Sequence, residues 1–82
     1  MAETRTSAAA FGEVLRQLRL DKGLTQDKLA ELANTERSHI SSLERAEKGP
    51  SLNTIFALAE ALDIRPGDLV ARVEQRLRNR AR

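Results

Sequence analysis

Residues 26–45, QDKLAELANTERSHISSLER, constrain the fold of this chain more than any other stretch. Leu29 and Ala33 recur at helical spacing before Asn34, and Ile40 and Leu43 do so after it. Asparagine is the non-glycine residue that best tolerates the positive φ angle of a tight turn between helices. The pattern therefore predicts two short helices, over about residues 26–33 and 36–45, with small polar and basic residues on the outer face of the second.

Three further helices are predicted around this pair. An apolar stripe at helical spacing marks residues 8–22, and Gly23 follows it as a left-handed cap. Ser51 suits the N-cap of a helix over residues 52–62, and Pro66 suits the first position of a helix over residues 66–79. Because no stretch alternates as a strand does, the predicted fold class is all-α with five helices.

Composition removes several classes of function. The 82 residues include no cysteine and a single histidine, so the sequence predicts no metal site, no cofactor and no catalytic activity. Only 2% of residues are aromatic, too few to stack the bases of single-stranded nucleic acid. No apolar run approaches the roughly 18 residues of a membrane span, and no signal peptide is evident, so a cytoplasmic protein is expected.

Charge is distributed unevenly along the chain. Five arginines and one acid lie between Arg72 and the C-terminus, and the rest of the chain is slightly acidic. Any nucleic-acid contact must therefore depend on local placement rather than on the net charge of +2. The expected organisation is a flexible segment over residues 1–7, one domain over 8–79 and a basic tail over 80–82. That tail is interpreted either as a solvated face or as a DNA contact.

Three motifs in register resemble the lambda- and 434-repressor-like helix-turn-helix domains. They are KGLTQDKLA, ISSLER and PSLNT, and the resemblance covers about Phe11 to Val70. Within it, ERSHISSLER is most similar to the recognition helix of the small controller proteins of restriction–modification systems. The chain departs from the pattern at Asn34, at Thr35, and where Ala46 and Glu47 replace a glycine and a basic residue.

The resemblance implies a dimeric transcriptional regulator that reads a pseudo-palindromic operator in double-stranded DNA. The third helix would enter the major groove. RNA polymerase would be a further partner if the protein activates transcription. The alternatives are a phage-type or chromosomal repressor, or an antitoxin or other protein-interaction module of the same fold.

The outer face of the third helix supplies the expected base contacts. The guanidinium fork of Arg37 can bond the O6 and N7 atoms of guanine, whereas the bland alternative is a solvated arginine. Four small or polar residues accompany it as candidates: Ser38, His39, Ser41 and Ser42.

Phosphate contacts are expected on both sides of that helix. Gln26 lies at a helix start and matches the phosphate-contacting glutamine of the resembling family. Thr25 beside it is chiefly a helix cap. The other candidates flank the far end of the third helix: Arg45, Lys48, Asn53 and Thr54.

Two structural contacts complete the expectations. The resemblance implies an ion pair between Arg19 and Glu44 that orients the third helix. Apolar residues near the C-terminal end are interpreted as a dimer contact, with the core of the single chain as the alternative. These residues are Phe56, Ile64, Val70, Val73 and Leu77.

Overall fold

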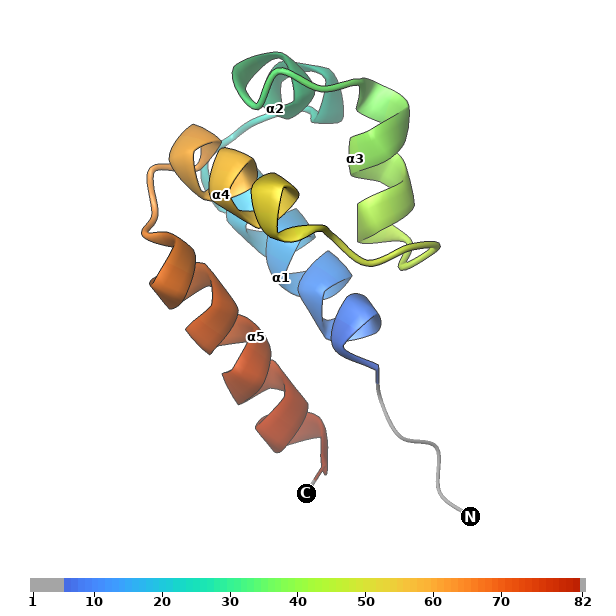
Figure 1. Ribbon diagram of the computed structural model, residues 1–82, viewed down its shortest axis with the longest axis vertical. Coiled ribbons are helices and arrows are strands. Elements are labelled where there is room, and N and C mark those ends of the chain that lie inside the picture. The colour runs from blue at the N-terminus through green and yellow to red at the C-terminus, as the bar shows by residue number, and fades with distance from the viewer. Residues whose placement is uncertain (1–5, 82) are drawn as a thin grey trace.

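The computed structural model describes residues 6–81, which form five helices and no strand (Figure 1). The helices are α1 (Ser7–Asp21), α2 (Gln26–Leu32), α3 (Arg37–Glu44), α4 (Leu52–Ala61) and α5 (Pro66–Ala81). The all-α prediction is confirmed, with boundaries within two residues of those expected. None of these helices is both long and apolar enough to cross a membrane.

Both ends of the domain extend further than predicted. Thr6 caps α1, because its side-chain oxygen accepts from the Ala9 amide at 3.0 Å. Residues 6–7, which were expected to belong to a flexible segment over residues 1–7, are the N-cap and the first residue of α1, and residues 1–5 lie outside the described range. Helix α5 continues to Ala81 because no breaker follows Asn79, so residues 80–81 are helical rather than a separate tail, and Arg82 is not described.

Within residues 6–81, four turns place a residue in the left-handed region. Gly23 (φ 70°) and Asn34 (φ 57°) were predicted to do so, and both follow the end of a helix. Ala46 (φ 61°) and Asp63 (φ 57°) were not predicted to do so, and neither is a glycine. Each reversal ends one helix sharply and lets the next pack back against the core.

Helix α1 is the centre of the packing, with α5 on one side and α3 on the other (Figure 1). Helix α2 packs on α3, and α4 packs on α5. The side chains that fill the core come from all five helices, and the largest of those fully buried are Leu15, Leu29, Ile40, Leu43, Leu58, Leu62 and Leu69. The inner face of α3 is therefore fixed by two neighbouring helices.

Gly12 permits a close approach between α1 and the end of α3, and it was not singled out in the sequence. A Cβ atom on this residue would lie 2.5 Å from the carbonyl oxygen of Leu43 and 2.8 Å from that of Glu44. Both are backbone atoms at the end of α3, so neither can swing aside. The absence of a side chain at Gly12 lets α3 lie directly on α1.

The residues expected to form the dimer contact differ in burial. Val73 is only 7% exposed and belongs to the core of the single chain, so its assignment to a dimer contact is not supported. Ile64 and Leu77 are partly buried against that core. Phe56 and Val70 remain 54% and 47% exposed, respectively. Residue type alone could not distinguish these cases, because the packing of α5 along α1 decides which side chains are buried.

Candidate nucleic-acid interface

Helix α3 is anchored by one face and exposed on the other. Ile40 and Leu43 are completely buried. Arg37 and Ser38 are exposed, and Ser41 and Ser42 are half-buried, so the predicted outer face is present. Glu36 occupies the N-cap in an extended conformation, but its side chain makes no capping hydrogen bond. The start of α3 is therefore held by tertiary packing rather than by a local cap.

Arg37 stands at the exposed start of this face. Its side chain is 63% exposed, and Nε lies 3.7 Å from Oδ1 of Asp27 in α2. An exposed pair at that separation contributes about 0–1 kcal/mol, so it does not fix the guanidinium. Arg37 can leave Asp27 for a stronger partner at little cost.

His39 occupies a different flank of α3. Its Nδ1 atom lies 3.0 Å from the Thr35 hydroxyl, and the ring is half-buried. Together with Asn53 and Thr54 it borders a shallow hollow beside α4. It shares this hollow with the predicted phosphate contacts Asn53 and Thr54. A base contact by His39 stays a prediction.

A buried polar cluster locks the inner side of α3. Arg19 donates from Nε to Oε2 of Glu44 at 2.6 Å and from Nη2 to Oε1 at 3.0 Å, which is a bidentate pair. Arg19 also donates from Nη1 to the Leu24 carbonyl at 2.9 Å, and the amide of Gln26 donates to Oε1 of Glu44 at 3.1 Å. The predicted pair is confirmed, and it joins α1, α2 and α3.

The contacts in this cluster favour the charged form of Arg19. The side chains of Arg19 and Glu44 are only 9% and 4% exposed. The hydrogen bond to Glu44 raises the pKa of Arg19, while burial acts in the opposite direction. Every oxygen of the Glu44 carboxylate has a donor, so the buried charge is neutralised and hydrogen-bonded.

Gln26 has a role that its sequence position did not reveal. It was predicted to contact phosphate, but its side-chain amide is directed inward to Glu44. The amide nitrogen retains a second N–H, and the residue is half-exposed at the start of α2. No local pattern links residues 18 positions apart, so only the fold brings Gln26 to Glu44.

The remaining phosphate candidates lie before the start of α3 and after its end. Thr25 caps α2 by accepting from the Lys28 amide at 3.0 Å, as predicted. Lys48 and Asn53 are exposed, and Thr54 accepts a hydrogen bond from the Ser51 hydroxyl at 2.9 Å. Lys48 lies in the loop between α3 and α4, and Asn53 and Thr54 lie in the first turn of α4.

Arg45 is held by two neighbours at the end of α3. Its Nε atom donates to Oε2 of Glu47 at 2.9 Å, and Nη1 donates to the Ser41 hydroxyl. The hydrogen bond from Arg45 lowers the pKa of Glu47, with a smaller contribution from Ser42, and the same bond to Glu47 raises the pKa of Arg45. Glu47 was noted in the sequence only as a departure from the family pattern.

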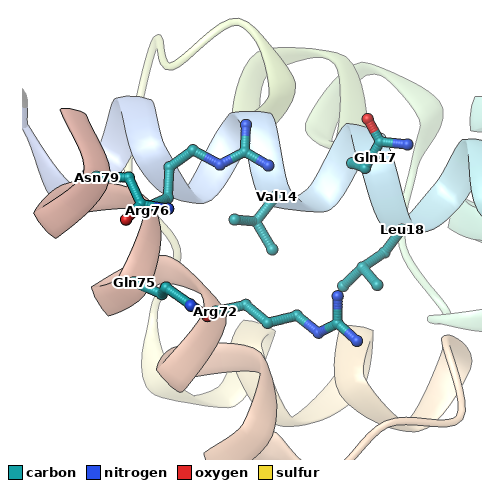
Figure 2. A pocket seen from close by; sticks show the side chains of 7 residues that line it. All are labelled: Val14, Gln17, Leu18, Arg72, Gln75, Arg76 and Asn79. Carbon is teal, nitrogen blue, oxygen red and sulfur yellow. The ribbon is translucent and has the colours of Figure 1, made fainter.

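The arginines of α5 belong to another surface. Arg72 and Arg76 reach from α5 across a groove floored by Val14 and Leu18 of α1, and Val14 lies between the two side chains (Figure 2). Arg76 donates to Glu13 at 3.1 Å. Because this groove lies on the α5 side of α1, these arginines do not extend the outer face of α3. In residues 6–81 no group of His, Asp or Glu side chains is arranged to hold a metal ion.

Comparison with known proteins agrees with this geometry. Residues 15–69 match a family model described as helix-turn-helix. The chain is 39% identical over 61 residues to control protein C.BamHI of Bacillus amyloliquefaciens, a match that covers 73% of this chain and 75% of that protein.

Two solved structures are similar as well. The restriction–modification controller protein C.AhdI of Aeromonas hydrophila is 45% identical, with a TM-score of 0.73, over 76% of this chain and 94% of that one. The clp gene regulator ClgR of Corynebacterium glutamicum is 28% identical, with a TM-score of 0.89, over 96% of this chain and 84% of that one. The motif, the exposed face of α3 and these similarities agree that the chain belongs to the helix-turn-helix family of DNA-binding transcriptional regulators.

Proposed function

We propose that this protein binds a pseudo-palindromic operator in double-stranded DNA as a homodimer and regulates transcription from it. One observation carries the proposal. Helix α3 is fixed on its inner side by Ile40, Leu43 and the buried Glu44, while its outer side presents exposed donors. A helix held in this way can enter the major groove without losing its orientation.

Arg37 is the principal base contact in this proposal. It lies at the start of α3, is largely exposed and is held only by a weak pair with Asp27. Its fork matches guanine in the major groove. Ser38, Ser41 and Ser42 are short enough to approach neighbouring bases without a clash. Phosphates on the two sides are bound by Thr25 and Gln26, and by Lys48, Asn53 and Thr54.

The dimer contact is proposed to centre on the apolar side chains that the fold leaves exposed. Phe56 and Val70 come from α4 and α5, and Ile64 and Leu77 are partly buried against the core. A two-fold axis through this surface would present two copies of α3 to one face of the DNA. Their separation would match successive major grooves, about 34 Å apart.

The relatives favour a controller role over the other possibilities. C.BamHI and C.AhdI are both controller proteins, and this chain spans most of each. The similarity to ClgR keeps a chromosomal regulator as the second candidate. The proposal places the protein in the cytoplasm with its DNA and gives it no enzymatic role. An activator would also contact RNA polymerase, and an antitoxin would instead copurify with a stoichiometric protein partner.

A binding assay tests the proposal directly. Fluorescence anisotropy would compare DNA from upstream of the gene with a scrambled duplex of equal length and composition. The wild type is expected to prefer the upstream DNA by at least about 1,000-fold. Arg37→Ala should lose about 1–3 kcal/mol on the upstream DNA and little on the scrambled duplex. Equal wild-type affinity for both duplexes would refute the proposal.

A further inference from the structure

The side chain of Arg45 folds back along the outer side of α3. Arg45 follows the last residue of the helix, and its amide donates to the Ser41 carbonyl at 3.0 Å. From there, Nη1 reaches the hydroxyl of the same Ser41, one turn earlier in the helix. The guanidinium therefore lies beside the predicted base-contact residues and not out toward the flank, where a phosphate contact was expected.

Glu47 is placed to hold the guanidinium there. Ala46 adopts a φ of 61°, which reverses the chain at the end of α3. The Glu47 amide then donates to the Ser42 carbonyl at 2.9 Å. With the backbone returned to the helix end, the carboxylate of Glu47 accepts from Nε of Arg45 at 2.9 Å. Ser41 and Glu47 thus hydrogen-bond two of the three nitrogens of the guanidinium.

The free end of the fork keeps the geometry that guanine requires. A guanidinium has five N–H groups. Glu47 takes the one on Nε and Ser41 takes one of the two on Nη1. The second Nη1–H and both Nη2–H groups remain, and they form the end of the fork that can donate two parallel bonds. We infer that Arg45 reads the O6 and N7 edge of a guanine in the major groove and that Glu47 is the residue that aims it.

The charge of Glu47 argues against a phosphate as the target. A phosphate beside Arg45 would also lie beside the Glu47 carboxylate, and the two like charges would repel. The Arg45–Glu47 pair has no net charge, so it adds little to the sequence-independent attraction for DNA. Exposed Lys48, next in the chain, is better suited to that attraction. The inference rests on the proposed operator binding, and it gives Arg45 a base contact in place of the phosphate contact expected from the sequence.

Base-analogue scanning tests the assignment. Each guanine of the operator half-site is replaced in turn by 7-deazaguanine, which lacks the N7 acceptor, and the affinity is measured for the wild type, Arg45→Ala and Arg37→Ala. One guanine should matter to the wild type and to Arg37→Ala but no longer to Arg45→Ala. Arg45→Ala should weaken operator binding about 5- to 150-fold, the range of one bidentate base contact. Scrambled DNA should be affected far less.

Glu47 is tested by two substitutions that differ in what they remove. Glu47→Ala should abolish the requirement for the same guanine. Glu47→Gln keeps an acceptor for Nε and should retain part of that requirement. Both variants should bind scrambled DNA about two- to fivefold more tightly, since one exposed negative charge is removed. The matched controls are Arg78→Ala and Glu74→Gln, because this exposed pair on α5 (3.2 Å) carries the same charges away from α3.

The outcomes separate this inference from the proposed function. If Arg45→Ala weakens operator and scrambled DNA by the same factor and reduces the salt slope by about 1, Arg45 is a phosphate contact and the inference is wrong. Operator binding would then still stand. If the wild type prefers no sequence at all, the proposed function itself fails. Thermal unfolding by circular dichroism verifies that each variant is folded.

Discussion

The buried contact between Glu44 and Arg19 offers the sharpest test of how α3 is held. Glu44→Ala removes the acceptor of two hydrogen bonds from Arg19 and one from Gln26. Arg19, with a side chain only 9% exposed, would keep its charge but lose its counter-ion. Removing one partner of a buried ion pair costs about 3–5 kcal/mol. Arg19 retains its bond to the Leu24 carbonyl, so the lower limit, about 3 kcal/mol, is expected.

A loss of this size is a large part of the stability of a small domain. The chain has 82 residues, and a domain of this length is stable by about 4–12 kcal/mol. The melting temperature should therefore fall by about 12–24 °C. Urea unfolding followed by circular dichroism measures the change in free energy, and the m-value should stay constant because the folded state remains compact.

Two companion variants make the reasoning refutable. Glu74→Ala removes the exposed partner of Arg78 and should change stability by no more than about 0.5 kcal/mol. Arg19→Met combined with Glu44→Leu removes both charges together and should cost less than Glu44→Ala alone, because no buried charge is stranded. A loss below about 1 kcal/mol for Glu44→Ala, or a double variant less stable than the single one, would refute this account.

Four further substitutions have directions fixed by the structure. Gly12→Ala should destabilise the domain by about 1–3 kcal/mol, because its Cβ would meet the backbone of α3, and urea unfolding would show this. Ala46→Gly should stabilise it by about 1 kcal/mol in the same assay, since φ is 61° there. Glu36→Asp supplies the missing N-cap of α3 and should raise the free energy of unfolding by about 0.5–1 kcal/mol, which a higher melting temperature would show. Val70→Glu places a charge on the proposed dimer surface, and sedimentation at micromolar concentration should detect monomers where the wild type is dimeric.

The features that could be predicted from the sequence are those encoded locally. Helical spacing of apolar residues and the caps at Thr25 and Ser51 were sufficient for five helices. The positive φ angles at Gly23 and Asn34 followed from residue type alone. The outer face of α3 was equally accessible, because Ile40 and Leu43 leave the remaining positions facing outward.

The features that escaped prediction depend on segments far apart in the chain. The need for glycine at position 12 arises only because α3 rests on α1 at that point. The hydrogen bond from Gln26 to Glu44 could not be predicted, because only the fold brings these two residues together. Val73 and Val70 lie on the same helix, but only the packing against α1 and α4 decides which one is buried.

The central position of α1 has a consequence for the spacing of the operator. One side of α1 supports α3, and the other supports α5, so in a dimer formed through α4 and α5 the distance between the two reading helices is set by packed cores rather than by a linker. Inserting one base pair between the half-sites shifts them by about 3.4 Å and rotates them by about 35°. Such a dimer could not change the distance between its two copies of α3 to match. It should therefore reject operators whose sequence is correct but whose half-sites are one base pair too far apart.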